Sequence, residues 1–285
     1  MILVAGGTGR LGSLVRSQLS GSGHPVRVLS RHGTGSGTGT GTDTVIGDVR
    51  DPQSLQRAFD GVRTVVSAVT GMAGTDGSSP GSVDRDGNAN LVEAARNSGA
   101  TVVLVSIVGV RADHPMELFR AKWAAEQNLL ASGVPWTIVR ATAFAETWRD
   151  VLAEVGGHSG RDRVLGRGQN PVNFVCVADV ASAVVRAAVD PTLRGHVVEV
   201  AGPENLSLLE LSRRLGQAIQ PPAHVPRAAL RAMAFLARPV SPTRARLARA
   251  ALVMDTADMR ADPAPGHAAY PWLPETRVGG QSVQS

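Results

Sequence analysis

Short apolar runs alternate with amphipathic helical segments along the first half of the chain. The predicted strands are 2–5, 26–30, 44–46, 64–69 and 101–107, and the predicted helices between most of them are 9–20, 52–59, 88–98 and 119–132. The strand segments are rich in β-branched residues and largely apolar, which suits a parallel sheet covered on both faces. Strand–helix alternation from the first residue therefore predicts an α/β fold with a doubly wound parallel sheet.

The second half first continues this pattern and then changes character. Further strands are predicted at 137–140, 172–177 and 196–200. A helix is predicted at 178–189, between the last two of these strands. Prolines then recur from Pro203 to Pro242, and they favour short helices separated by turns. The sequence therefore predicts a sheet domain over 1–202 and a smaller, mainly helical C-terminal cap over 203–285.

Two glycine-rich segments interrupt the pattern. Residues 33–42 read GTGSGTGTGT, a composition that cannot bury apolar surface. A mobile loop is predicted there, in place of the helix expected between the second and third strands. Residues 71–87 are rich in Gly and Ser and are also predicted to form a loop.

Composition limits the class of protein. The 285 residues are 43% hydrophobic and 19% charged, which is typical of a globular protein and excludes a coiled coil or a disordered chain. No apolar run approaches the roughly 20 residues that span a bilayer, and no basic segment or cleavage site follows Met1. We therefore expect a cytoplasmic protein without a membrane as partner. The single Cys176 lies in an apolar run, so we expect a buried, inert thiol, no disulfide and no metal site.

Arginine dominates the basic residues. The net charge is +5, and the segment from Leu211 to Met254 holds eight Arg and no Asp or Glu. An anionic substrate, a carrier protein or a nucleic acid would fit such a surface, but solvated helix faces are the simpler explanation. No helix-turn-helix, zinc-finger or RNA-binding pattern accompanies the charge. We expect a small-molecule substrate and no nucleic acid partner, and oligomer formation stays open.

A glycine-rich turn follows the first predicted strand. Residues 2–12 read ILVAGGTGRLG, and Gly7, Gly9 and Gly12 satisfy the spacing G-x-G-x-x-G. Gly6 with the last two satisfies the related spacing G-x-x-G-x-x-G. Glycine allows the tight turn and the close approach of backbone to a pyrophosphate, and the helix N-terminus offers its N–H groups. Because the turn joins a strand to a helix, the pattern predicts a dinucleotide site.

Arg31 stands at the end of the second predicted strand, where the adenosine ribose of a dinucleotide would lie. An acidic residue here would favour NAD, but nothing acidic is nearby. A guanidinium suits a 2′-phosphate, so we expect NADP(H); a solvated charge at the strand end is the alternative. In GDVRD, Asp48 is placed to accept a hydrogen bond from the adenine amino group, and Val49 to flank the ring. Asp51 is more simply the N-cap of the next helix.

These residues resemble the NmrA-like group of atypical short-chain dehydrogenase/reductases over roughly residues 1–205. The segments that carry the resemblance are AGGTGRLG, LSRH, GDVRD, GNANLVEAARNSGATVVLVS, AKWAAEQNLLASGVPWTIVRATAF, VADVASAV and VAGPENLSLLEL. Members of the group include quinone and isoflavone-type reductases, and also non-catalytic NADP-responsive regulators. The resemblance therefore implies a Rossmann sheet that binds NADP(H) more firmly than it implies a reaction.

The resemblance also implies roles for individual positions. The pyrophosphate would contact Gly6, Thr8, Gly9, Arg10 and Leu11, the 2′-phosphate Arg31, and the adenine Asp48 and Val49. The ribose on the nicotinamide side would be lined by Ala68, Val69 and Thr70, and the nicotinamide approached by Thr142, Ala143 and Phe144. Ser106 lies where many members keep a catalytic serine, and Lys122 falls at the lysine of the group.

The sequence departs from the group at the catalytic tyrosine. A Tyr-x-x-x-Lys pair would need Tyr at 118, where this chain has Leu118, and its one tyrosine is Tyr270. Lys122 is also the only lysine beside 28 arginines. Three interpretations of Lys122 stay open: an acid or base, a ligand of the ribose hydroxyls, or a surface lysine paired with Glu126 one helical turn on.

Two functions compete. The first is an NADPH-dependent oxidoreductase that reduces a small apolar carbonyl, enone or quinone, with Met72, Phe144 and Trp148 lining an apolar pocket, unless those side chains are ordinary core. The second is a non-catalytic NADP(H)-binding redox sensor, which the missing tyrosine favours. Isomerase or dehydratase chemistry is a third, weaker option. His114 and His158 lie in predicted loops, where a solvated histidine is more common than a proton donor.

Overall fold

The computed structural model describes residues 1–32, 42–72, 74, 76–156, 163–215 and 223–279. Contacts divide the chain into two compact units, Met1–Arg140 with Val180–Glu199, and Ala141–Asp179 with Val200–Ser285. The division predicted at 202/203 gives cofactor binding to residues 1–202 and a cap to residues 203–285, and this division stays a prediction. Within the described residues, no helix has both the length and the apolar character needed to cross a membrane.

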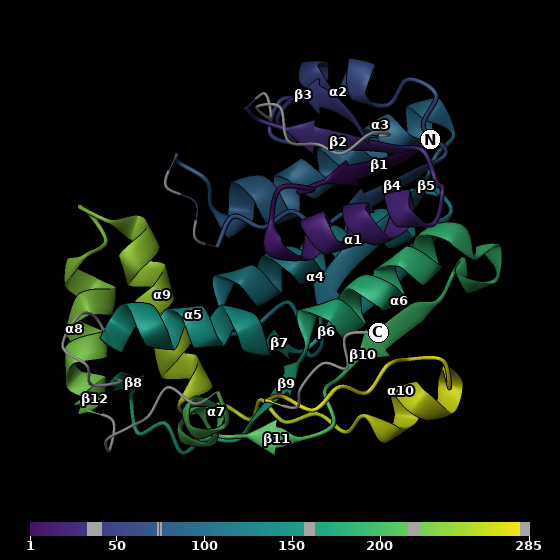
Figure 1. The fold of residues 1–285 in the computed structure, drawn as a ribbon. Coiled ribbons are helices and arrows are strands. Elements are labelled where there is room, and N and C mark those ends of the chain that lie inside the picture. Colours follow the sequence, from purple (N-terminus) through teal and green to yellow (C-terminus); the bar gives the residue numbers. More distant parts are fainter. Residues whose placement is uncertain (33–41, 73, 75, 157–162, 216–222, 280–285) are drawn as a thin grey trace. The chain divides into compact units, whose positions relative to one another are not determined.

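A seven-stranded sheet forms the centre of the first unit (Figure 1). Its strands, in spatial order, are β10 (Val197–Val200), β6 (Trp136–Ala141), β5 (Thr101–Ile107), β4 (Thr64–Ser67), β1 (Ile2–Ala5), β2 (Val26–Ser30) and β3 (Thr42–Ile46). The pairs β5–β4, β4–β1, β1–β2 and β2–β3 are all parallel. Every residue of β1 and β4 is buried, as expected for strands covered on both faces.

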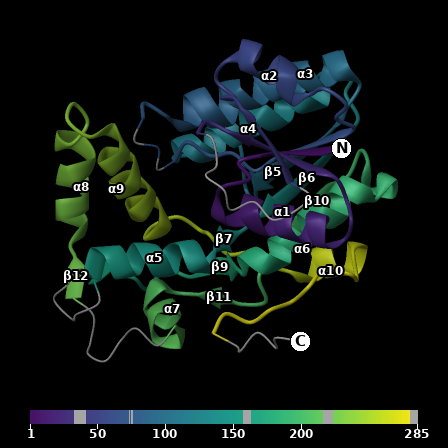
Figure 2. The ribbon, with the colours of Figure 1, turned by 45° about the horizontal axis from the view of Figure 1, so that its top comes forward.

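Helices cover both faces of this sheet. They are α1 (Arg10–Gly21), α2 (Pro52–Ala58), α3 (Asn88–Ser98), α4 (Glu117–Ala131) and α6 (Val177–Val189), with a short 3₁₀ turn at Pro191–Leu193. Helices α2, α3 and α4 lie side by side on one face, and α1 packs on the opposite face (Figure 2). The predicted doubly wound α/β fold is therefore confirmed.

Two details of the first unit differ from the prediction. Residues 33–41 of the predicted loop lie outside the described residues, but Thr42 begins strand β3. The loop predicted over 71–87 is wrong in its second half, because Pro80–Gly87 form a π-helix, η1. Ser79 begins η1 with a capping box to Ser82, and Pro80 occupies the first turn. These local signals overcome the Gly- and Ser-rich composition.

The second unit combines small sheets with helices. Its strands are β7 (Ala143–Phe144), β8 (Arg163–Leu165), β9 (Val172–Val175), β11 (Asn205–Leu206) and β12 (Ala223–Val225), and its helices are α5 (Ala145–Gly156), α7 (Leu208–Arg214), α8 (Arg227–Leu236), α9 (Pro242–Met254) and α10 (Ala264–Ala269). Strand β9 joins β7 and β11 in a sheet of three strands. Cys176 follows β9 and is half-buried, so the burial expected for its thiol is only partial. The run of helices α7 to α10 agrees with the helical C-terminal region predicted from the sequence.

Candidate functional site

The β1–α1 turn accepts only glycine at two positions. Gly6 has φ +83°, and a Cβ atom there would lie 2.6 Å from the carbonyl oxygen of Ala68 in the segment after β4. A Cβ atom on Gly12 would lie 2.1 Å from the carbonyl oxygen of Gly6. Helix α1 therefore packs directly on the turn. Its N-cap is Gly9, and neither a side-chain cap nor an acidic residue occupies its first turn. An anion is the natural ligand of such a helix end.

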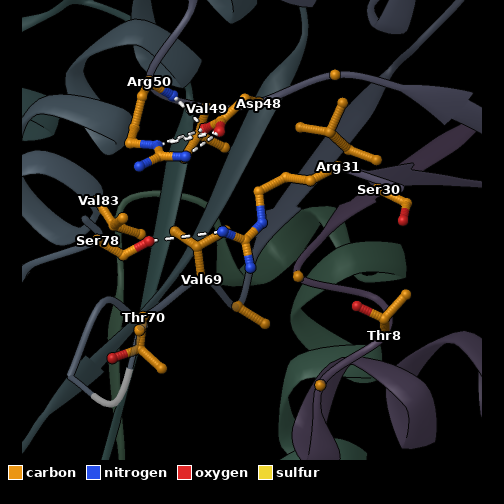
Figure 3. Close-up of a pocket in the computed structure, with 16 residues that line it drawn as sticks. Thr8, Ser30, Arg31, Asp48, Val49, Arg50, Val69, Thr70, Ser78 and Val83 are labelled. Atoms are coloured by element: carbon orange, nitrogen blue, oxygen red, sulfur yellow. Dashed lines mark hydrogen bonds and ion pairs between the residues drawn. The ribbon is translucent and has the colours of Figure 1, made fainter. Parts of the chain in front are cut away.

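A pocket of about 230 Å³ opens beside this turn, at the carboxyl ends of the central strands (Figure 3). It is lined by Gly6, Thr8 and Gly9 after β1, by Leu29, Ser30 and Arg31 at the end of β2, by Gly47, Asp48, Val49 and Arg50 after β3, by Ala68, Val69 and Thr70 after β4, and by Gly74, Ser78 and Val83. Strand β1 has β2 on one side and β4 on the other, so the chain order reverses here. Open α/β sheets bind ligands at such switch points.

Most of the cofactor residues predicted in the first unit meet in this pocket. Nine of them line it, namely Gly6, Thr8, Gly9, Arg31, Asp48, Val49, Ala68, Val69 and Thr70. Arg10 and Leu11 are not among the lining residues; Leu11 is buried and Arg10 is exposed. Asp51 accepts a hydrogen bond from the Gln53 backbone amide at 3.0 Å, so its expected role as N-cap is confirmed.

Arg31 extends from β2 across the pocket toward the opposite wall (Figure 3). Its Nη1 atom forms an ion pair with Asp76 and lies 3.5 Å from the Ser78 hydroxyl. The statement that nothing acidic lies near Arg31 is therefore wrong in three dimensions. The loop after β4 returns to the pocket and carries Asp76 with it.

Arg50 is a second guanidinium at the same place. Its Nη2 and Nε atoms lie 2.6 and 3.0 Å from Oδ2 of Asp48, and Nη2 also lies 3.4 Å from Asp76 Oδ2. The hydrogen bonds from Arg50 lower the pKa of Asp48, although partial burial opposes the shift. Asp48 is thus held as a carboxylate, with Arg50 as its partner. Hydrogen bonding to adenine stays a prediction for this residue.

Lys122 is buried and pinned between two elements. Its Nζ atom donates to the carbonyl oxygen of Val69 at 3.0 Å and lies 3.1 Å from Asp84 Oδ1 in η1. Asp84 also accepts a hydrogen bond from the Gly71 amide at 2.8 Å. Burial raises the pKa of Asp84, while Lys122 and the hydrogen bonds oppose that rise. Lys122, the only lysine of the chain, therefore contacts the pocket wall through the backbone carbonyl of Val69.

A surface lysine paired with Glu126 is the interpretation that this geometry overturns. Glu126 is 1% exposed, and its carboxylate accepts from Nε and Nη2 of Arg140 at 3.0 and 2.7 Å. Glu126, the partner that helical spacing would give to Lys122, is thus paired with Arg140 on β6. Lys122 pairs instead with Asp84, in a contact that no local pattern predicts.

Ser106, near the end of β5, has an unused hydroxyl. The residue is 1% exposed, and its Oγ atom has no hydrogen-bond partner among the described residues. Buried hydroxyls nearly always have a partner, so this one has capacity for a ligand group or a water. His114, in contrast, is buried and not solvated as expected. Its Nδ1 accepts from the Met116 amide at 3.1 Å, and burial lowers the pKa of the ring, which favours neutral imidazole.

The remaining predicted residues belong to the second unit, except Met72. Thr142 donates from Oγ1 to Asn173 Oδ1 at 2.8 Å, and Ala143 and Phe144 form β7. Trp148 is partly buried against the apolar cores of its own unit, as ordinary packing would require. A shared substrate pocket for Met72, Phe144 and Trp148 stays a prediction. His158 lies outside the described residues.

Among the charged and polar residues that sequence reasoning missed at the site are Arg50, Asp76, Ser78 and Asp84. Arg50 could have been found, since it follows Asp48 by two positions in GDVRD. Asp84 had a weaker signal, a carboxylate four residues before the buried Asn88 that opens a helix. Asp76 and Ser78 had none, because their segment was expected to be an irregular loop.

Known proteins resemble the chain over most of its length. A family model described as NAD(P)H-binding matches residues 6–191. An NAD(P)H azoreductase from Xenophilus azovorans is 28% identical over 224 residues, which cover 76% of this chain and 73% of that protein. The (4-alkanoyl-5-oxo-2,5-dihydrofuran-3-yl)methyl phosphate reductase of Streptomyces griseus is 30% identical over 236 residues, covering 77% and 76%.

Solved structures share the fold. The NADPH-dependent quinone oxidoreductase of Escherichia coli, in complex with NADPH, superposes with a TM-score of 0.76 over 98% of this chain and 97% of its own. The two sequences are 19% identical. At that identity the likeness concerns the fold, and the chemistry has to be argued from the residues of this chain.

Proposed function

The chain belongs to the NAD(P)H-binding family, with NmrA-like atypical short-chain dehydrogenases/reductases as its relatives, and we propose that it is an NADPH-dependent reductase of a small apolar carbonyl, enone or quinone. One observation carries the proposal. A single pocket joins the glycine turn of β1–α1 to the Arg31 guanidinium at the end of β2. That arrangement provides one site for a pyrophosphate and another for a 2′-phosphate.

The residues present fit a dinucleotide phosphate. Gly6 and Gly12 leave no space for a side chain, so the β1–α1 turn has only backbone at these positions. The uncapped start of α1 would offer its amide N–H groups to a phosphate, and Thr8 adds a hydroxyl to the pocket lining. Arg31 would hold the 2′-phosphate that distinguishes NADPH from NADH. Bound NADPH supplies a hydride from the nicotinamide ring.

Lys122 would supply positive charge on the nicotinamide side. An ammonium has three N–H donors; one donates to the Val69 carbonyl oxygen, and Asp84 Oδ1 is an ion-pair partner 3.1 Å away. A remaining donor is available to a ribose hydroxyl or to the substrate atom that becomes negative as hydride arrives. Asp84 is fully buried and balances the charge of the Lys122 ammonium. The Ser106 hydroxyl is a further donor in this part of the first unit.

Quinones and conjugated enones suit a site without the family tyrosine. Position 118 is Leu118, and no phenol stands four residues before Lys122. Reduction of a quinone or enone spreads the developing charge over a conjugated system, which asks less of a protein acid than a simple ketone does. The names of the relatives, an azoreductase and a reductase of a dihydrofuranyl methyl phosphate, support reduction as the reaction class.

A non-catalytic NADP(H)-responsive regulator is the second candidate, and Leu118 is the observation that favours it. Single-turnover oxidation of NADPH against a panel of quinones, enones and azo dyes separates the two. Calorimetry with NADPH alone controls for binding. A reductase oxidises NADPH with at least one class of the panel. Tight NADPH binding with no oxidation across the panel would establish the regulator.

A further inference from the structure

Two guanidinium groups that line the pocket, those of Arg31 and Arg50, both pair with the carboxylate of Asp76. Asp76 forms an ion pair with Nη1 of Arg31, and its Oδ2 atom lies 3.4 Å from Nη2 of Arg50. Arg50 also donates from Nη1 to the backbone carbonyl of Asp76 at 3.3 Å. The Ser78 hydroxyl donates to the same carboxylate. Two arginines of the pocket wall are therefore already paired with a carboxylate of the same chain.

This carboxylate and a 2′-phosphate require the same donors. Asp76 occupies Nη1 of Arg31, and a phosphate bound to the same guanidinium would compete for that donor and be repelled by the like charge of the carboxylate. Arg31 extends across the pocket toward Ser78 (Figure 3), and its Nη1 atom pairs there with Asp76. A phosphate held by Arg31 would have to replace the carboxylate or pull the guanidinium away from it.

Resting on the proposed function, we propose that Asp76 is a specificity-determining residue that competes with the 2′-phosphate of NADPH for Arg31. The preference for NADPH over NADH then reflects a difference between two ion pairs, Arg31 with phosphate and Arg31 with Asp76. NADH has no 2′-phosphate, so it leaves the second pair intact. Asp76 thereby weakens the binding of NADPH and not of NADH, and it reduces the difference between the two affinities.

The pocket wall does not depend on the Arg31–Asp76 pair for its position. The side chains are 46% and 41% exposed, and ion pairs this exposed contribute little to stability. The segment is fixed independently at its ends. Gly71 donates to buried Asp84, and the Ser79 hydroxyl caps η1. Removing the charge of Asp76 should therefore change anion binding without collapsing the wall.

The test measures dissociation constants for NADPH and NADH by calorimetry at low salt, in wild type and Asp76→Asn. Adenosine 2′,5′-bisphosphate and 5′-AMP serve as probes that lack the nicotinamide. Asp76→Asn should tighten NADPH and the bisphosphate about three- to tenfold and leave NADH and 5′-AMP within about twofold. Asp86→Asn is the matched control, since Asp86 is an exposed carboxylate of η1 whose ion-pair partner is Arg85, an arginine that does not line the pocket.

A double-variant cycle separates the two assignments. In an Arg31→Ala background, Asp76→Asn should no longer affect NADPH, because the shared partner is gone. Unchanged NADPH affinity in Asp76→Asn, while Arg31→Ala still weakens it, overturns the competition and leaves the 2′-phosphate assignment standing. Equal weakening of both cofactors would show that Asp76 only supports the wall. No loss of NADPH affinity in Arg31→Ala would overturn the cofactor assignment itself, and the competition with it.

Discussion

The Lys122 ammonium lies 3.1 Å from the Asp84 carboxylate, and the two side chains are only 5% and 0% exposed. The pair joins α4 to η1 and, through the Lys122–Val69 hydrogen bond, both to the segment after β4. A lysine charge this deeply buried needs a counter-charge, and Asp84 provides it. The only lysine of the chain is thus half of a buried ion pair, and it also contacts the pocket wall through the Val69 carbonyl oxygen.

Replacing Lys122 should separate cofactor binding from chemistry. Lys122→Arg keeps a positive charge but cannot give up a proton, so we expect NADPH affinity to stay and single-turnover oxidation to fall about 10²-fold. Lys122→Ala should lose the same rate and also weaken NADPH, since a ribose donor is removed. Stopped-flow absorbance of the reduced nicotinamide, with the best substrate of the panel, gives the rate. Unchanged binding and rate in Lys122→Ala would show that the lysine takes no part.

Loss of folding is the obvious confounder, because an unpaired buried Asp84 costs about 3–5 kcal/mol. The double variant Lys122→Met with Asp84→Asn removes both charges. We expect thermal unfolding to return toward the wild-type temperature while the oxidation rate stays low. Recovery of both together would mean that the pair is structural.

The strands of the sheet and the glycine turn were open to prediction because they depend on local pattern. Apolar runs specify buried strands, and Gly6 and Gly12 specify a turn without Cβ atoms. The partners of Lys122 and Arg31 were not open to prediction. Helical spacing gives Lys122 a neighbour at Glu126, but the contact that forms is with Asp84 in η1. Such pairs are chosen by packing in three dimensions, and helix periodicity does not encode them.

The π-helix η1 shows a second limit. Composition favoured a loop there, because Gly and Ser are frequent in 71–87. Capping by Ser79 and the pyrrolidine of Pro80 start the helix, and the buried Asp84 and Val83 fix it to the unit. The Ser79 cap alone would have indicated a helix. The burial of Asp84 in that helix could not be predicted, because it depends on the ion pair with the buried Lys122.

Cofactor choice should depend on Arg31. We expect NADPH to bind at least about tenfold tighter than NADH, a difference of about 1.4 kcal/mol, because only NADPH gives the guanidinium a phosphate. Arg31→Asp should abolish or reverse the preference. Arg96→Asp, an exposed arginine of α3, is the control and should leave both affinities unchanged. Calorimetric titration with each cofactor gives the ratio. Equal affinities in wild type would contradict the 2′-phosphate role.

Cys176 should react slowly with alkylating reagents. Partial burial raises the pKa of its thiol to about 11, and the nearby Glu146 and Asp179 carboxylates add to the rise. At pH 8 only about one thiol in 1,000 is then a thiolate, against roughly a quarter for an ordinary cysteine. We expect iodoacetamide to label native protein about 10²-fold more slowly than urea-unfolded protein. Mass spectrometry of timed samples measures this, and labelling should still accelerate as pH rises from 8 to 10. Equal rates in both states would exclude the shift.

Alanine scanning of the glycines around α1 should give three different results from three similar changes. At Gly12, a Cβ atom 2.1 Å from the Gly6 carbonyl must push α1 off the turn. Overpacking of this kind costs about 1–3 kcal/mol, which exceeds the gain of about 1 kcal/mol from alanine in a helix. Gly12→Ala should therefore unfold at lower temperature and bind NADPH poorly. Gly21, at the end of the same helix, has nothing within 4 Å of its Cβ position, so Gly21→Ala should be neutral or stabilising.

Gly9 separates binding from folding in the same series. A Cβ atom there would meet only the Gly6 carbonyl oxygen, at 3.3 Å, yet Gly9 lines the pocket at the start of α1. Gly9→Ala should therefore keep nearly the wild-type unfolding temperature and still lose NADPH affinity, because its methyl group faces the space that a pyrophosphate needs. Differential scanning fluorimetry, with and without NADPH, reads both quantities at once: the temperature without cofactor reports the fold, and the increase on adding it reports binding. A full cofactor-induced increase in Gly9→Ala would place the pyrophosphate elsewhere, even if Gly12→Ala behaves as expected.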